Sequence, residues 1–199
     1  MTALSAITSS RAVQKTTRIP GEAGIWVLVL GDMAEFALFF GTFMYARGSN
    51  PAAFAEGNST LNLTYGALNT VLLLTSSLLV AQAVATSQKA EHSEVVRLLN
   101  GAFLCGIGFV AIKALEWSHL LQAGHSITSS QFYLYYFMFT GIHLVHVLIG
   151  LTALGRIRQT ARRPEPTPHL PATIETFGIF WHMVDLLWIV LFALFYLIE

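Results

Sequence analysis

Five apolar stretches, each long enough to cross a lipid bilayer, fill most of this chain of 199 residues. The hydrocarbon core of a bilayer is about 30 Å thick, so a spanning helix needs about 20 mostly apolar residues. Backbone polar groups in lipid must be hydrogen-bonded within the spanning segment, which favours helices over strands here. The sequence therefore predicts an all-α fold, an integral membrane bundle of five transmembrane helices. The expected spans are Ala23 to Ala46, Gly66 to Thr86, Val96 to Leu121, Gln131 to Gly155 and Ile174 to Ile198.

Composition agrees with a membrane protein and excludes an ordinary soluble domain. Hydrophobic residues make up 54% of the chain and charged residues only 11%, against about 25% charged in soluble domains. We expect one membrane domain over residues 21–199, preceded by a disordered cytoplasmic tail over residues 1–20. The single cysteine, Cys105, excludes disulfides within the chain. No nucleic-acid partner is expected for a chain of zero formal net charge.

The cations are distributed unevenly between the two ends of the predicted helices. Nine of the eleven Lys and Arg residues fall on one side if the five spans alternate in direction, and only Arg47 falls on the other. Loops on the cytoplasmic side of a membrane carry an excess of Lys and Arg. The sequence therefore predicts a multi-pass protein of the bacterial inner membrane, with its N-terminus in the cytoplasm and its C-terminus outside.

Ionisable residues near the middle of four spans are the candidate functional residues. Members of each pair lie three residues apart, which places them on neighbouring positions of one helix face. Such residues are costly in lipid, so they usually contact a partner or mark a functional site. The predicted buried polar residues, or subunit and lipid contacts, are Asp32, Glu35, Lys113, Glu116, His143, His146, His182 and Asp185.

Three interpretations of these residues compete. They could satisfy one another between helices and fix the packing register. They could instead contact a larger partner, a lipid headgroup or a proton-accessible cavity. They could also form a metal site, because Glu116 and His119 match the Glu-x-x-His pairing of di-iron helical bundles. That pairing occurs only once, and His143 and His146 are expected at a different depth, so we predict no catalytic, cofactor or metal residue in this chain.

Two other segments have simpler interpretations. The aromatic run from Phe132 to Phe137 begins the fourth span and is typical of an aromatic belt at the membrane interface. The segment from Gly48 to Tyr65 is expected to be the longest loop outside the membrane.

Two motifs near the end of the chain resemble subunit III of the haem–copper oxidases. The run from Thr140 to Gly150, TGIHLVHVLIG, resembles the fourth-span signature of that family, and the run from Trp181 to Trp188, WHMVDLLW, resembles its final helix. Glu35, in EFALFF, matches the family's buried, carbodiimide-reactive carboxylate. The resemblance extends over all five spans. The N-terminal part of the first span looks most like a branch encoded beside nitric oxide reductases.

The resemblance implies an accessory subunit that binds no haem or metal itself. Haem and copper or iron would belong to the partner, which is catalytic subunit I of a haem–copper oxidase or, alternatively, of a nitric oxide reductase. The chain would support assembly, phospholipid binding, and proton uptake or stability of the catalytic subunit in aerobic electron transport. His143, His146, His182 and Asp185 would contribute hydrogen bonds that stabilise the bundle. A self-contained membrane metalloenzyme is the alternative from another functional class.

Overall fold

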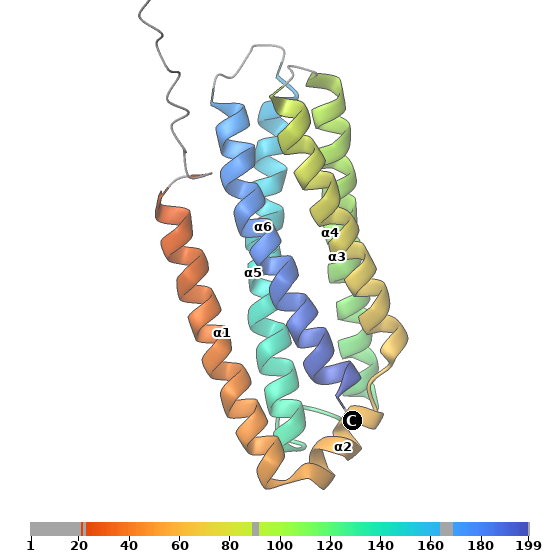
Figure 1. Ribbon diagram of the computed structural model, residues 1–199. Helices are drawn as coiled ribbons and strands as arrows, with labels where there is room; N and C mark the ends of the chain where they lie inside the picture. Colours follow the sequence, from red (N-terminus) through yellow and green to blue (C-terminus); the bar gives the residue numbers. More distant parts are fainter. Residues whose placement is uncertain (1–20, 22, 89–91, 164–168, 199) are drawn as a thin grey trace, which may run out of the picture.

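The computed structural model describes residues 21, 23–88, 92–163 and 169–198, and the tail predicted over residues 1–20 lies outside them. Within these ranges the secondary structure is helical, and five helices are long and apolar enough to cross a membrane. They lie side by side and alternate in direction (Figure 1). The all-α bundle is therefore confirmed. Its elements are α1 (Ala23–Ser49), α2 (Pro51–Ser59), α3 (Leu63–Ser87), α4 (His92–Gln122), α5 (Gln131–Ala161), α6 (Leu170–Phe192) and the π-helix η1 (Ala193–Leu197).

The expected loop between the first two spans is wrong in part, because it contains the short helix α2. The Asn50 side chain accepts a hydrogen bond from the Ala53 N–H at its N-terminus, and Pro51 occupies the first turn, where its missing N–H has no cost. Phe54 is 2% exposed, and its ring packs edge-on against Phe43 of α1 at 5.2 Å between centroids. Helix α2 therefore covers one end of the bundle.

Helices α3 to α6 form a closely packed group around Trp181, which is fully buried. A Cβ added at Gly150 of α5 would come within 2.6 Å of Trp181 Cε3, so only glycine fits there. The Trp181 Nε1–H donates to Ser76 Oγ of α3 at 3.0 Å. Ser76 in turn donates to the Ala102 carbonyl of α4 at 2.9 Å. Trp181 and Ser76 together thus connect four helices.

Helix α1 stands at the edge of this group, and its ribbon is farther from α5 at its N-terminal end than at its C-terminal end (Figure 1). Its inward contacts are mainly aromatic. Phe39 stacks on Phe139 of α5 at 5.3 Å between centroids, and Phe43 packs edge-on against Phe195 at 5.1 Å. Much of the remaining surface of α1 is exposed.

The aromatic run at the start of α5 is not an interfacial belt. Phe132, Tyr133, Tyr136 and Phe137 are all buried, with Tyr136 fully so. The run faces α2, η1 and the end of α4 rather than lipid headgroups, because helix α2 and the C-terminal turn cover it. This places the Tyr136 hydroxyl inside the bundle.

Candidate functional site

The polar residues within the spans separate into four places in the bundle. The first joins α1 to α5, where His146 Nε2 lies 3.3 Å from Asp32 Oδ2 and both side chains are mostly buried. His146 Nδ1 lies 2.9 Å from the Ile142 carbonyl, so that nitrogen must carry a proton and donate it. A bond between Nε2 and the carboxyl group then needs one further proton, on either residue. The contact therefore joins α1 to α5 through an acid and a histidine.

Glu35 differs from its neighbour Asp32. The Glu35 side chain is exposed on the outward face of α1, so this chain alone does not bury it. Side chains three residues apart on an α-helix point in directions that differ by about 60°. This angle is enough for Asp32 to face α5 while Glu35 faces away from the bundle. The contact of Glu35 with a partner subunit or lipid remains a prediction.

The second place is a buried ion pair within α4. Lys113 Nζ lies 2.7 Å from Glu116 Oε2, with side chains only 1% and 3% exposed, so the predicted pairing is confirmed. The Tyr196 hydroxyl donates to Glu116 Oε1 and accepts from Lys113 Nζ at 3.1 Å. The ammonium group also lies 4.6 Å from the ring centroid of Trp188, a cation–π distance. Each charge in this cluster is thus compensated inside the protein.

Tyr136 and Tyr196 are the members of this cluster that sequence reasoning missed. The Tyr136 hydroxyl is 3.4 Å from Lys113 Nζ and 3.4 Å from the Tyr196 hydroxyl. Both tyrosines lie far from Lys113 along the chain. The signal that could have found them is the buried lysine itself, because a cation in a membrane span needs more than one acceptor.

The third place is formed by His182 and Asp185 of α6. The His182 ring shares a hydrogen bond with Ser77 Oγ of α3, although the residue as a whole is exposed at the surface of α6. Asp185 is 7% exposed. Its Oδ1 has no hydrogen-bond partner among the described residues. The predicted stabilising role therefore has support for His182, which joins α6 to α3.

His143 occupies the fourth place, and among the described residues it does not form the hydrogen bonds expected of it. The residue is fully buried, with its ring 5.6 Å from Phe109 and 5.4 Å from Trp188 between centroids. Within the described chain neither ring nitrogen has a hydrogen-bond partner. Its observed contacts are thus aromatic packing across α4, α5 and α6.

The donors considered for a metal site do not come together. Glu116 is held by Lys113 and Tyr196, whereas His119 Nδ1 lies 3.4 Å from the Tyr65 hydroxyl. The parts of the chain that the structure describes contain no group of three His, Cys, Asp or Glu side chains placed to hold a metal ion. The geometry therefore supplies acid–base and hydrogen-bonding groups in separate clusters.

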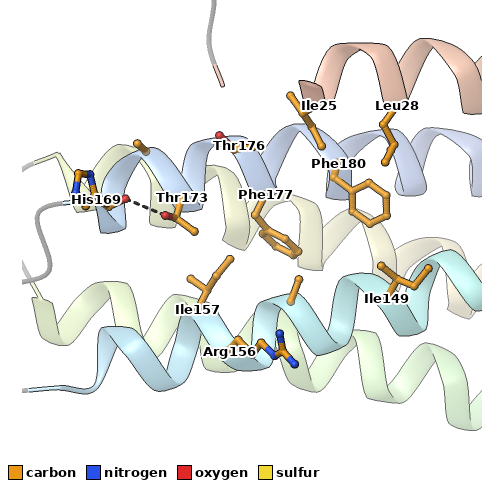
Figure 2. Close-up of a pocket in the computed structure, with 12 residues that line it drawn as sticks. Ile25, Leu28, Ile149, Arg156, Ile157, His169, Thr173, Thr176, Phe177 and Phe180 are labelled. Atoms are coloured by element: carbon orange, nitrogen blue, oxygen red, sulfur yellow. Dashed lines mark hydrogen bonds between the residues drawn. The ribbon is translucent and has the colours of Figure 1, made fainter. Parts of the chain in front are cut away.

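A cavity of about 600 Å³ lies between the N-terminal part of α1, the C-terminal half of α5 and the first half of α6. Its walls are apolar, with Ile25 and Leu28 of α1 facing Phe177 and Phe180 of α6 (Figure 2). Arg156 of α5 and His169 at the start of α6 supply polar groups to its lining. The cavity can accept an elongated apolar molecule that has a polar or anionic end.

Comparison with known proteins gives matches along nearly the whole chain. A family model described as cytochrome c oxidase subunit III matches residues 11–199. Cytochrome bo(3) ubiquinol oxidase subunit 3 of Pseudomonas putida is 29% identical over 175 residues, covering 88% of this chain and 84% of that protein. Cytochrome c oxidase subunit 3 of Corynebacterium diphtheriae is 30% identical over 178 residues, covering 88% and 87%. Heme-copper oxidase subunit I+III of Aeropyrum pernix is 25% identical over 191 residues, covering 88% and 22%.

Proposed function

This chain belongs to the cytochrome c oxidase subunit III family, and on that basis we propose that it is a non-catalytic accessory subunit of a respiratory haem–copper oxidase. The observation that carries the proposal is the family match over residues 11–199, which includes all five spanning helices. The chain is accordingly a multi-pass membrane protein. The relatives named above include both a ubiquinol oxidase and a cytochrome c oxidase subunit, so either electron donor fits.

The proposed partner is catalytic subunit I, which would carry the haem and copper. One relative is named for subunits I and III together, and this chain matches 22% of its length. A chain that contains both subunits supports direct contact between them. The nitric oxide reductase alternative remains a prediction, and no relative named above is a reductase.

We propose that the cavity between α1, α5 and α6 holds a phospholipid. Its apolar walls suit an acyl chain. Arg156 lies 25 residues after the start of α5, roughly 37 Å along the helix, and therefore at the membrane surface given a hydrocarbon core of about 30 Å. Basic residues between spanning helices at that depth bind anionic headgroups. Arg156 is also one of the nine Lys and Arg residues that fall on one side of the predicted helices. Their excess supports the proposed orientation, with this end of the bundle in the cytoplasm of a bacterium.

The function can be tested by purifying the oxidase with and without this chain. We expect the complex without the chain to begin turnover at a similar rate but to lose oxygen consumption sooner, because its catalytic subunit has lost lateral support. Arg156→Leu should reproduce part of that loss and lower the anionic phospholipid per complex, measured by mass spectrometry. Arg163→Leu, which changes a cation outside the cavity lining, is the control. Unchanged yield, lipid content and durability in the absence of the chain would contradict the proposal.

A further inference from the structure

Another cavity, of about 390 Å³, lies between the start of α3 and the end of α4, and we name it the α3–α4 pocket. The lining residues that matter here are Tyr65, Glu116, His119, Leu120, Ala123 and His125. His119 and Ala123 are exposed, whereas Glu116 is only 2% exposed. The pocket therefore connects the surface of the protein to the buried carboxyl group of the Lys113–Glu116 ion pair.

The pocket lies close to the surface of the membrane. Helix α4 has 31 residues and is therefore roughly 46 Å long. With the helix centred on a hydrocarbon core of about 30 Å, each end projects about 8 Å beyond the core. Glu116 precedes the last residue of α4, Gln122, by two helical turns, or roughly 9 Å along the axis. Its carboxyl group is thus near the boundary between hydrocarbon and water.

The walls of the pocket supply hydrogen-bonding groups beside this carboxyl group. The Tyr65 hydroxyl lies 3.4 Å from His119 Nδ1, and the His125 ring stacks on Tyr133 at 4.5 Å between centroids. Imidazole and phenol groups can both donate and accept hydrogen bonds. A cavity of this volume with polar groups in its walls has room for several water molecules. Water is therefore the occupant that fits both the location and the chemistry of the pocket.

Glu116 is also held by the last turn of the chain. The Tyr196 hydroxyl, which donates to Glu116 Oε1, belongs to the π-helix η1. The Asn58 side chain fixes the end of η1, because its Nδ2–H donates to the Ile198 carbonyl at 2.7 Å. π-helices are rare and are found frequently at functional sites. Glu116 thus contacts a fixed hydroxyl donor as well as the pocket.

The surroundings of Lys113 allow Glu116 to lose its charge. The ammonium group donates to the hydroxyls of Tyr136 at 3.4 Å and Tyr196 at 3.1 Å. It also lies 4.6 Å from the ring centroid of Trp188, 5.4 Å from that of Tyr136 and 5.6 Å from that of Tyr196. Aromatic faces attract a cation, most strongly where water is excluded. The cation therefore keeps favourable contacts when the carboxyl group is neutral.

We propose that the α3–α4 pocket admits water to Glu116, and that this carboxyl group takes up and releases protons through the pocket. The proton comes from water or from a protonated His119 or His125, forms an O–H bond on the carboxylate, and leaves its donor with one proton fewer. A rise in pH reverses the transfer. The titratable groups that surround Glu116 are Lys113 and His119 of α4, Tyr136 of α5, Tyr196 of η1, and Tyr65 and His125 across the pocket.

Water access can be tested by labelling cysteines in the full chain in lipid nanodiscs, where both membrane faces are open to the reagent. In a Cys105→Ser background, a charged thiosulfonate that does not enter lipid should modify Leu120→Cys, although Leu120 is 6% exposed. Leu194→Cys is the matched control, since Leu194 is 7% exposed and lies outside the lining of this pocket. It should remain unmodified. Absence of labelling at position 120, or equal labelling at both positions, would overturn the proposal.

Infrared spectroscopy of the same preparation follows the proton. Lowering the pH should produce the C=O band of protonated carboxyl groups, and one component of it should be missing from Glu116→Gln. Ala123→Trp places a large side chain in the pocket and should slow the growth of that component by about tenfold or more, because uptake then requires local opening of the helices.

Ala114→Trp, on the exposed surface of α4 outside the pocket lining, is the control and should leave the rate unchanged. A band that is identical in Glu116→Gln and the wild type would overturn the proposal. So would equal rates in the wild type and Ala123→Trp. The association of the chain with haem is not involved in either measurement, so the proposed function stands or fails separately.

Discussion

The group of helices α3 to α6 and the outlying helix α1 solve the same problem, polar residues in a membrane, in different ways. In the group, Lys113 and Glu116 are enclosed together with Tyr196, and hydrogen bonds of Trp181 and Ser76 link α6, α3 and α4. On α1, Asp32 has one partner at 3.3 Å, while Glu35 faces outward. The first region thus satisfies its charges internally, whereas the second leaves the Glu35 carboxylate exposed.

The difference indicates where stability and assembly are determined. A buried charge whose partners lie in the same chain contributes to the folding of that chain. An exposed acid on a helix with few inward contacts contributes only when a partner arrives. Substitutions in α3 to α6 should therefore act on the stability of the chain, and those on the outward face of α1 on its association.

The largest effect should come from breaking the buried ion pair. Lys113→Met removes the cation and leaves Glu116 uncompensated, which should lower the free energy of unfolding by about 3–5 kcal/mol. The double variant Lys113→Met, Glu116→Leu removes both charges and should recover most of that loss. Unfolding of the full chain in detergent, followed by tryptophan fluorescence, measures both. If the double variant were no more stable than Lys113→Met alone, the uncompensated charge on Glu116 would not be the cause of the lost stability.

A smaller effect is expected from filling the space beside Trp181. Gly150→Ala places a methyl group within 2.6 Å of the Trp181 ring, and such overpacking costs about 1–3 kcal/mol. Gly31→Ala on the exposed surface of α1 meets nothing within 4 Å, so the chain alone should keep its stability or gain up to about 1 kcal/mol from the helical preference of alanine. The same unfolding measurement compares the two. Equal losses at both positions would remove the distinction between the regions.

The smallest effect should come from the pair that ties α1 to α5. Asp32→Leu should cost about 1 kcal/mol, a typical value for one hydrogen bond, and should loosen α1 without unfolding the other helices. In a Cys105→Ser background, maleimide labelling of Val29→Cys should become faster, because Val29 is 6% exposed in the intact structure. Asp32→Asn can still donate to His146 Nε2 and is the control. Labelling that does not respond to Asp32→Leu would mean that aromatic contacts alone hold α1.

Much of the fold could be predicted because membrane spans follow from length and apolarity. The Lys113–Glu116 pair was also predictable, since both residues lie on one helix and three positions apart. Local spacing cannot show which face of a span turns inward, because a helix that is apolar all round carries little directional signal. This explains why the spacing alone could not separate Asp32 and Asp185, which are mostly buried, from Glu35 and His182, which are exposed.

The parts that escaped prediction depend on contacts between distant segments. The position of Tyr136 at the start of a span predicts a residue at the membrane interface. In the structure its hydroxyl group is hydrogen-bonded to Tyr196, which lies near the C-terminus. His143 matches a family signature, but the hydrogen bonds expected of it are not formed within the described residues. Pair spacing gives candidates for a site, and only the packing of helices decides which of them meet.

The central claim is that this chain works as an accessory subunit of a haem–copper oxidase, and its association with haem tests that claim most directly. The tagged chain would be purified from its native membrane in mild detergent and examined by visible absorption and metal analysis. We predict co-purified haem and copper with the catalytic subunit, both lost when a harsher detergent removes that subunit. Stoichiometric iron, copper or zinc remaining on the isolated chain, or a mild preparation without haem, would contradict the claim.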